Sequence, residues 1–309
     1  MQVGLSQIVK EAMKIPCETF AKRVEEAAEL LRTERGSLPN FEILERLVKI
    51  KPSGRGLIVG DLHGDLESLV QILQDSNILR NMNTKQNSLL IFLGDYGDRG
   101  DFSAEVYYTI LTLKIHYHHQ IVLMRGNHEG PADLLASPHD LPYGFKERFG
   151  ENWAEAYAVM LKLFEHLYNC VLVDDRYLIV HGGIPQNAKT LEDLAGAHLS
   201  HPKNSFLEEI LWSDPDEMTE ETVPSPRGAG KLFGKKVTNE ALRRYHARIL
   251  IRGHEPCEEG FKINHDGKVL TLFSRKGSPY FNVSGAYLDV DLTEKFESAE
   301  QLLPYVHKF

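Results

Sequence analysis

The sequence is short of cysteine, of long apolar runs and of positive charge, and each shortage excludes a class of protein. Its three cysteines, Cys17, Cys170 and Cys257, lie far apart and form no CxxC pair, so neither a disulfide framework nor a thiolate zinc site is indicated. No stretch approaches the roughly 18 apolar residues of a membrane-spanning helix, and the start MQVGLSQIVKEAMK lacks the apolar core of a signal peptide. We therefore expect a soluble, unsecreted protein of the reducing cytoplasm that has no membrane partner.

The charge balance is acidic. The chain carries 35 Lys and Arg against 44 Asp and Glu, which gives a formal net charge of −9 and a sequence pI of about 5.9. A general nucleic-acid binder needs a basic surface to contact phosphates, so we expect no nucleic-acid partner. A local basic pocket remains compatible with this total.

The length of 309 residues, 42% of them hydrophobic, suits one large α/β domain. From the start to about Val48 the apolar residues recur at helical spacing. We predict two or three amphipathic helices there, of which the last is FEILERLVKI at 41–50. Residues 1–50 would then be a helical cover that belongs to the same domain as residues 51–309.

Three apolar runs dominate the stretch from Leu57 to Glu129, and each ends in glycine and polar residues. They read LIVGDLHGD, LLIFLGDYGDRGD and IVLMRGNHEG. Continuous Leu, Ile and Val suit strands that are buried on both faces, and polar clusters just beyond such strands suit ligands held at the carboxyl edge of a sheet. A helical pattern follows the first two runs, as in a βαβ unit. We expect one site, built from several strand ends.

The second half of the chain predicts more strands with the same kind of ending. CVLVDDRYLIVHGGIP indicates a hairpin that ends at His181, and ARILIRGHE indicates a strand over 249–251 that ends at His254. GFKINHDGKVLTLFS predicts a further hairpin, and AYLDVDL another strand. A helix is predicted at WAEAYAVMLKLFEHL, and the tail after the last strand looks like a short helix.

Five predicted strand ends carry groups that could bind a metal: Asp61 and His63, Asp95 and Asp98, Asn127 and His128, His181, and His254. Oxygen and imidazole donors without thiolates suit Mn²⁺, Fe²⁺ or Zn²⁺. Asp61 and His63 are separated by one residue on an extended segment, so they point the same way and can hold one ion together. A carboxylate has two oxygens, which makes Asp95 the natural bridge between two ions. Such a pair lowers the pKa of bound water towards neutrality.

These motifs resemble the signature of the PPP-type metallophosphoesterases. GDLHG, GDYGDRG, RGNHE, HGG and RGH occur in the order found in serine/threonine protein phosphatases similar to types 1, 2A and calcineurin and their archaeal and bacterial relatives. The likeness runs from about Arg55 to about Asp289, and it includes LWSDPDE and TLFS, which resemble the protein-phosphatase branch. It implies the calcineurin-like metallophosphoesterase fold, an α/β fold in which helices flank a central mixed β-sandwich with a dimetal site at its strand ends.

The resemblance also implies a role for each matching residue. The first metal would be held by Asp61, His63 and Asp95. The second would be held by Asp95, Asn127, His181 and His254. The general acid would be His128, with Asp98 holding its other ring nitrogen. Phosphate would be bound by Arg99, Arg227 and Asn127. Two supporting residues are expected, Glu129 and Arg252.

The implied reaction is a one-step in-line displacement. A hydroxide that bridges the two ions attacks phosphorus, and His128 protonates the departing serine or threonine oxygen. Mn²⁺ is the preferred ion, with Fe and Zn as alternatives. The chain departs from the family pattern at Gly97, where Val is usual and where we expect a looser loop. In RKGSPYF, a loop about one residue shorter than in the eukaryotic enzymes, Tyr280 is the candidate for the tyrosine that those enzymes carry near the site.

We therefore predict a hydrolase, a serine/threonine protein phosphatase, whose partner is a phosphoprotein substrate. Regulatory subunits are further partners that the sequence does not identify. One alternative is a small-molecule phosphoesterase such as a dinucleoside polyphosphate hydrolase, because related enzymes share the metal motifs. LWSDPDE followed by Arg227 favours the protein substrate. A catalytically inactive docking protein is disfavoured because every expected ligand is present, and a nuclease because the net charge indicates no basic groove.

Overall fold

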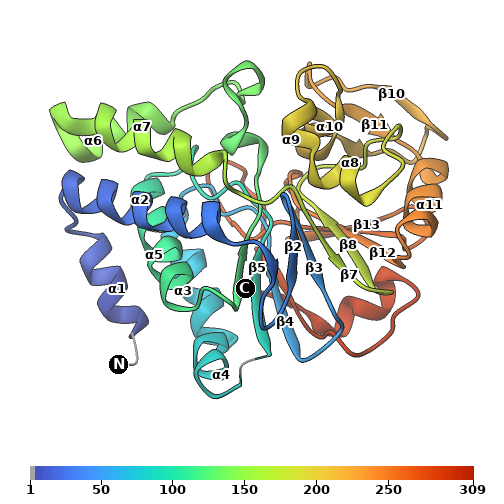
Figure 1. Cartoon of the computed structure of the whole chain (residues 1–309), viewed down its shortest axis with the longest axis horizontal. Helices are drawn as coiled ribbons and strands as arrows, with labels where there is room; N and C mark the ends of the chain where they lie inside the picture. The colour runs from blue at the N-terminus through green and yellow to red at the C-terminus, as the bar shows by residue number, and fades with distance from the viewer. Residues whose placement is uncertain (1–3, 86) are drawn as a thin grey trace.

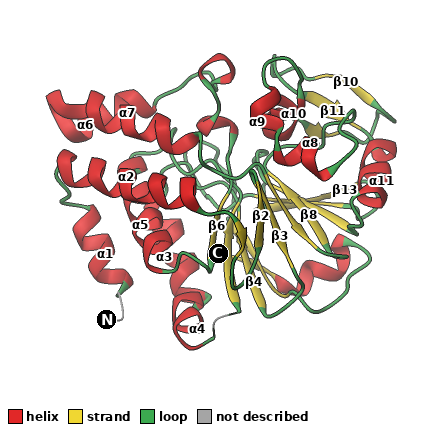
Figure 2. Ribbon diagram, viewed as in Figure 1, coloured by secondary structure: helices red, strands yellow, loops and turns green. Residues whose placement is uncertain are grey.

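The computed structural model describes residues 4–85 and 87–309, so the first three residues of the predicted N-terminal cover lie outside the described residues. Two β-sheets stack against each other in the middle of the molecule, and helices gather on both outer sides (Figure 1). Figure 2 shows the strands of the sandwich between the two groups of helices. The expected mixed β-sandwich with helices on its outer faces is therefore confirmed.

The five-stranded sheet contains the first three predicted strands. Its order is β16-β15-β4-β5-β6, with bounds β16 Val306–Lys308, β15 Ala286–Asp291, β4 Arg55–Val59, β5 Ser88–Phe92 and β6 Ile121–Leu123. Strand β4 pairs in parallel with β5, and β5 with β6, so the carboxyl ends of all three meet at one edge. All five residues of β5 are buried, as the continuous apolar run predicts.

The eight-stranded sheet has the order β1-β2-β3-β7-β8-β12-β14-β13. The bounds are β1 Gly36–Ser37, β2 Glu42–Leu44, β3 Leu47–Ile50, β7 Cys170–Val173, β8 Tyr177–Val180, β12 Ile249–Arg252, β14 Val269–Leu272 and β13 Phe261–Asn264. The hairpins β7–β8 and β13–β14 are antiparallel as predicted, while β8 and β12 run in parallel. The ends of β8 and β12 therefore point the same way.

Helices cover the sandwich in two groups (Figure 1). The first group is α1 Leu5–Ala12, α2 Cys17–Thr33, α3 Leu66–Asp75, α4 Ile78–Thr84, α5 Ser103–His116, α6 Leu141–Phe149 and α7 Trp153–Phe164. The second is α8 Leu191–Ala195, α9 Ala197–Ser200, α10 Phe206–Trp212 and α11 Lys235–Arg244. A three-stranded sheet lies beside the second group, with β9 Asp214–Pro215, β10 Thr222–Pro224 and β11 Lys231–Phe233. Short 3₁₀ helices are η1 Asn127–Glu129, η2 Ala132–Leu134, η3 Gly150–Asn152 and η4 Ala299–Tyr305.

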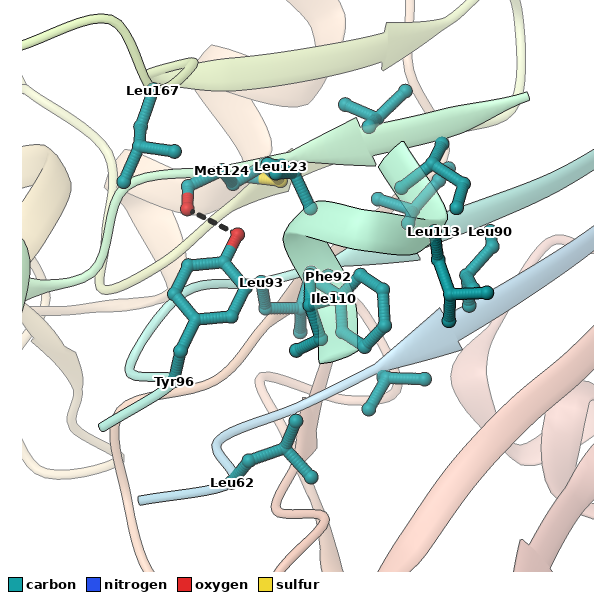
Figure 3. Close-up of a cluster of buried hydrophobic side chains, with 14 of the residues drawn as sticks. Leu62, Leu90, Phe92, Leu93, Tyr96, Ile110, Leu113, Leu123, Met124 and Leu167 are labelled. Carbon is teal, nitrogen blue, oxygen red and sulfur yellow. Dashed lines mark hydrogen bonds between the residues drawn. The ribbon is translucent and has the colours of Figure 1, made fainter. Parts of the chain in front are cut away.

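Two hydrophobic cores follow from the alternation of side chains in the eight-stranded sheet. Val171 and Ile179 face the larger core, which contains both sheets and the first helix group. Cys170 and Leu178, one residue before each, face the smaller core under the second helix group. Figure 3 shows part of the larger core, where the Tyr96 hydroxyl donates a hydrogen bond of 2.8 Å to a backbone carbonyl.

One predicted helix is wrong, and one is confirmed in part. Residues 41–50 form the hairpin β2–β3, in which Ile43 is buried between two exposed residues, because β3 pairs in parallel with the distant strand β7. The apolar pattern of these ten residues is compatible with a helix as well as with a strand, and the pairing with β7 decides for the strand. The tail contains the predicted short helix as the 3₁₀ helix η4, in which Pro304 cannot donate an α-helical hydrogen bond. The strand β16 that follows it is not predicted by the sequence. Among the described residues, no helix has the length and apolar character needed to cross a bilayer.

Candidate active site

The predicted strand ends converge where the two sheets meet at their carboxyl edges. Asp61 follows β4 and forms an isolated parallel bridge with Phe273, which follows β14 in the other sheet. The backbone carbonyl of Asp95, after β5, accepts hydrogen bonds from the amides of Leu62 and His63. These contacts bring the loops of both sheets to one place.

The backbone at this edge is strained. Five non-glycine site residues take a positive φ, namely His63 at 43°, Asp95 at 53°, Asp98 at 69°, Arg99 at 68° and His254 at 70°. Such residues cost roughly 1–3 kcal/mol each and occur mainly where the surrounding structure holds them in place for function. The loops also approach closely, since a Cβ atom at Gly253 would lie 2.4 Å from the Asp61 carboxylate.

The first predicted metal group places one imidazole nitrogen against two carboxylates. His63 Nε2 lies 3.8 Å from Asp61 Oδ2 and 3.5 Å from Asp95 Oδ2. The other ring nitrogen, Nδ1, lies 3.3 Å from the Gly97 carbonyl, which can only accept, so Nδ1 carries the proton. In the neutral ring, the lone pair of Nε2 therefore faces two negative groups, an arrangement that suits a cation.

The second predicted group repeats this arrangement. His181 Nδ1 donates to the Leu93 carbonyl at 2.9 Å, so its Nε2 lone pair faces Asn127 Oδ1 at 3.0 Å and Asp95 Oδ1 at 3.5 Å. His254 Nδ1 also lies 3.0 Å from Asn127 Oδ1. Asp95 thus turns one oxygen towards each group, as a bridging carboxylate would. Asp95, His181 and His254 of the second group are compact enough to hold an ion, and His63 and Asp95 of the first group form a compact set with His128. The donor types suit divalent ions of the borderline class.

Burial governs the charges of these groups. It raises the pKa of Asp61 to about 7, and burial together with the charge of Asp61 raises the pKa of Asp95 well above its ordinary value. Burial, followed by nearby positive groups, lowers the pKa of His63 and of His181 well below the ordinary value. The imidazoles are therefore neutral, which is the form that binds a metal. The positive charge of Arg252 only partly offsets the effect of burial on the pKa of Asp61.

The predicted acid and its partner are in contact. His128 Nδ1 lies 2.7 Å from Asp98 Oδ2, and the His128 ring packs edge-on to His63 at 4.8 Å between centroids. Although burial raises the pKa of the Asp98 carboxyl, hydrogen bonds from His128 and His139 outweigh it and hold that pKa below its usual range. An ionised Asp98 can only accept, so His128 Nδ1 donates and Nε2 is left for the cleft that His128 lines.

The site opens into a cleft of about 460 Å³. Arg99 and Arg227 line it, together with the apolar residues Leu134, Ala136 and Trp212. The Arg99 Nε is buried and has no hydrogen-bond partner among the described residues. The cleft therefore offers guanidinium groups beside an apolar wall, which suits a phosphoryl group carried on a larger molecule.

Three residues that the motifs do not assign also belong to the site. Asp214, from LWSDPDE, accepts from Arg227 Nε at 2.6 Å and from the buried Arg252 at 2.7 Å. His139 contacts Asp98 Oδ2 at 3.0 Å. Tyr280, singled out in the RKGSPYF loop, lines the cleft with its ring 5.2 Å from that of His63. The sequence offers a signal for Asp214 and Tyr280 but none for His139.

Two expectations about the loops can be compared with the packing. The Glu129 carboxylate accepts hydrogen bonds from the amides of Asp95, Tyr96 and Gly126 and from the Tyr107 hydroxyl, which fits the structural role expected for it. At Gly97, a Cβ atom would lie 2.5 Å from the Tyr107 ring. The space that a valine side chain would need is therefore filled by Tyr107.

The chain is similar to known phosphoesterases. Residues 55–258 match the family described as calcineurin-like phosphoesterase. The chain is 31% identical to the serine/threonine-protein phosphatase PP2A-like PPG1 of Saccharomyces cerevisiae, over 76% of this chain and 66% of that protein. It is 32% identical to the serine/threonine-protein phosphatase SIT4 of Candida albicans, over 78% of this chain and 76% of that protein.

A solved structure shows the same architecture. It is a protein serine/threonine phosphatase from Saccharomyces cerevisiae with similarity to human phosphatase PP5, and it matches with a TM-score of 0.73 and 25% identity over 89% of this chain and 83% of that chain. The chain spans less than two thirds of some curated relatives, such as 58% of a probable serine/threonine-protein phosphatase of Encephalitozoon cuniculi.

Proposed function

Because the chain belongs to the calcineurin-like phosphoesterase family, within its branch of serine/threonine protein phosphatases, we propose that it hydrolyses phosphoserine and phosphothreonine in proteins. One observation carries the proposal. The two oxygens of Asp95 face two separate groups of atoms that could bind a metal, and the hydrogen-bonded pair of His128 and Asp98 lies beside these groups. This combination suits hydrolysis of a phosphate ester whose leaving group needs a proton.

The metal-binding residues of the proposal are those with converging lone pairs. One ion would be held by Asp61, His63 and Asp95, and the other by Asp95, Asn127, His181 and His254. When bound, two divalent ions supply an activated water near neutral pH and offset the charge of the phosphoryl group. Mn²⁺ is the proposed ion, with Fe and Zn as alternatives, because carboxylate, amide and imidazole donors suit all three.

His128 is the proposed general acid. Its backbone amide donates to Asp95 Oδ1 at 3.1 Å, which fixes the acid relative to the metal groups. Asp98 accepts from Nδ1, which leaves Nε2 as the nitrogen that can give a proton to the departing serine or threonine oxygen. A proton donor held in this way contributes about 10² to 10⁴ in rate.

Arg99 and Arg227 are the proposed phosphoryl-binding residues. Arg227 is held by Asp214 through Nε, which leaves its terminal nitrogens for a ligand in the cleft. Asn127 is proposed to contact phosphate as well, because it lines the same cleft. Donors already aimed at the phosphoryl oxygens stabilise charge without reorganising during the reaction.

The apolar wall of the cleft supports a phosphoprotein as the substrate and partner, since Leu134 and Trp212 can contact a peptide beside its phosphorylated residue. The proposed place of action is the cytoplasm, where phosphoproteins are abundant, and regulatory subunits stay a prediction.

We also propose that residues 1–50 and 51–309 form one domain. The shared core supports this, because Ile8, Phe20 and Val24 pack in the same cluster as the strands of both sheets.

The test is phosphate release from a phosphothreonine peptide by chelator-treated protein, with and without added Mn²⁺. We expect release only with the metal. His128→Asn should retain bound Mn²⁺ and lose about 10² to 10⁴ in turnover. The matched control is His307→Asn, which changes an exposed histidine on β16 and should leave turnover intact.

Two outcomes would contradict the proposal. Rapid cleavage of a dinucleoside polyphosphate, with no release from the peptide, would move the function to small molecules. Loss of bound Mn²⁺ from His128→Asn would show that His128 is a ligand and not the acid.

A further inference from the structure

The Asp98 carboxylate binds a second histidine besides the proposed acid. His139 Nδ1 lies 3.0 Å from Asp98 Oδ2, the same oxygen that His128 Nδ1 contacts at 2.7 Å. His139 lies in the segment between η2 and α6, outside every motif that the sequence analysis assigned. Its side chain is 13% exposed, so it contacts Asp98 from within the protein and not from the solvent.

The segment that carries His139 holds both oxygens of Asp98. The amide of Asp140 donates to Asp98 Oδ1 at 2.7 Å, and the amide of Arg99 donates to the same oxygen at 3.0 Å. Asp98 Oδ2 takes the two imidazoles. Four donors around one carboxylate leave it no freedom to rotate without breaking a hydrogen bond.

The histidines act as hydrogen-bond donors here and not as metal ligands. Asp98, His128 and His139 form a group that is compact enough to hold an ion. However, Nδ1 of His128 and Nδ1 of His139 both lie at hydrogen-bond distance from Asp98 Oδ2, so no space for an ion remains between these atoms. An ionised Asp98 only accepts, which requires a proton on Nδ1 of each ring.

His139 is itself fixed by the helix behind it. Its Nε2 lies 2.9 Å from the hydroxyl of Tyr157 on α7. The Tyr157 ring packs at 6.4 Å, edge to face, against Phe145 of α6 and at 6.3 Å against Trp153. The contacts thus run from the packed helices through Tyr157, His139 and Asp98 to the proposed acid. Tyr157 belongs to the apolar stripe of α7, and its hydroxyl serves the site.

We propose that His139 is a positioning residue: together with Tyr157 it holds the Asp98 carboxylate in the orientation that directs His128 Nε2 towards the leaving oxygen. This inference rests on the proposed phosphatase function. His139 touches neither the substrate nor the metal groups in this role, and it acts only through Asp98.

The role has a distinctive kinetic signature. A serine or threonine alkoxide is a poor leaving group and needs the proton from His128, whereas a nitrophenolate leaves without one. A misplaced acid therefore slows a phosphothreonine peptide much more than p-nitrophenyl phosphate. Misfolding or metal loss would slow both substrates alike, because both need the same metal groups and arginines.

The experiment compares His139→Ala, His139→Asn and Tyr157→Phe on the two substrates, with the Mn²⁺-loaded full chain. For His139→Ala we expect kcat on the peptide to fall about 10- to 100-fold, since small misplacement of a catalytic group costs this much, with KM nearly unchanged. On p-nitrophenyl phosphate, kcat should change by less than about threefold, because no acid is needed. His139→Asn, whose amide can donate from the position of Nδ1, should recover most of the loss. Tyr157→Phe should cause a smaller loss on the peptide alone.

The outcomes separate the two proposals. If the wild-type protein releases no phosphate from the peptide, the proposed function fails. If the wild type is active and His139→Ala slows both substrates by the same factor, or slows neither, His139 does not position the acid. Failure of His139→Asn to recover activity beyond His139→Ala would also overturn the inference, because the hydrogen bond to Asp98 would then not be the reason for the loss.

Discussion

Asp61 should make the metal-free protein less stable as the pH rises. Its carboxylate is fully buried and accepts the His254 amide at 3.0 Å, but it faces a second carboxylate, Asp95, across the first metal group. Burial raises the pKa of Asp61 to about 7 in the folded state, against 3.8 for an ordinary aspartate. The folded state therefore binds a proton that the unfolded state has already lost between these two values.

The sign and size of the effect follow from this difference. Below about pH 4 the group is protonated in both states and contributes nothing. Between about pH 4 and about pH 7 the folded state binds one proton more than the unfolded state. The free energy of unfolding therefore falls by about 1.4 kcal/mol for each pH unit. The total is on the order of a few kcal/mol, because Asp61 shares this titration with the neighbouring carboxyl of Asp95. A bound cation would reverse the effect, because it favours the ionised carboxylate.

The measurement is the free energy of urea unfolding of wild type and Asp61→Asn at several pH values between 5 and 8, with chelator present. Asp61→Asn keeps the shape of the side chain and cannot ionise, so its stability advantage over wild type should grow with pH and level off near pH 7. Added Mn²⁺ should stabilise wild type much more than the variant, which serves as the internal control. Parallel stability curves of the two proteins in chelator would refute the reasoning.

Two further predictions concern charged side chains. Arg227→Ala should lower kcat/KM for a phosphothreonine peptide about 10- to 100-fold, which corresponds to roughly 1.5–3 kcal/mol for hydrogen bonds to a charged group. Arg227→Lys should recover only part of this loss, because lysine lacks the guanidinium fork. Unchanged kcat/KM in steady-state kinetics would exclude Arg227 from phosphate binding. Lys114→Met should lower the free energy of unfolding by about 3–5 kcal/mol, because Glu34, which Lys114 contacts at 2.7 and 2.9 Å inside the core, would be left as an unpaired buried charge. Adding Glu34→Gln to Lys114→Met should restore much of that stability in urea unfolding.

The parts of the fold that the sequence could predict are those set by local pattern. The apolar run of β5 is long enough and flanked clearly enough by glycine to identify a buried strand, and the HDG turn identifies the hairpin β13–β14. The convergence of the site also follows from the sequence, because parallel strands must end at one edge. The hairpin β2–β3 could not be read in this way, since its ten residues fit two periods and the deciding contact is with β7.

The same distinction applies to the candidate site. Asp61 and His63 could be predicted as a pair from their spacing, and the structure brings both towards Asp95 although His63 takes a positive φ and the segment is not extended there. His139 could not be paired with Asp98, because the two residues are far apart in the sequence and the connecting segment has no regular pattern. The packing of α6 against α5 and α7 brings the segment to Asp98. Short motifs therefore indicate the residues that could bind a metal or transfer a proton. The residues that hold them in position come from distant parts of the chain and are not indicated by a motif.

The strained backbone of Asp95 depends on non-local packing of this kind, through the buried side chain of Glu129. Asp95 at φ 53° would relax in an isolated loop, since the left-handed conformation of a non-glycine residue is unfavourable. The Glu129 carboxylate prevents this by accepting the amides of Asp95 and Gly126 at once, which ties the loop after β5 to the loop after β6. In this backbone conformation Asp95 directs one carboxylate oxygen towards His63 and the other towards His181. The glutamate of NHE therefore acts on the geometry of Asp95, although it contributes no ligand atom to either metal group.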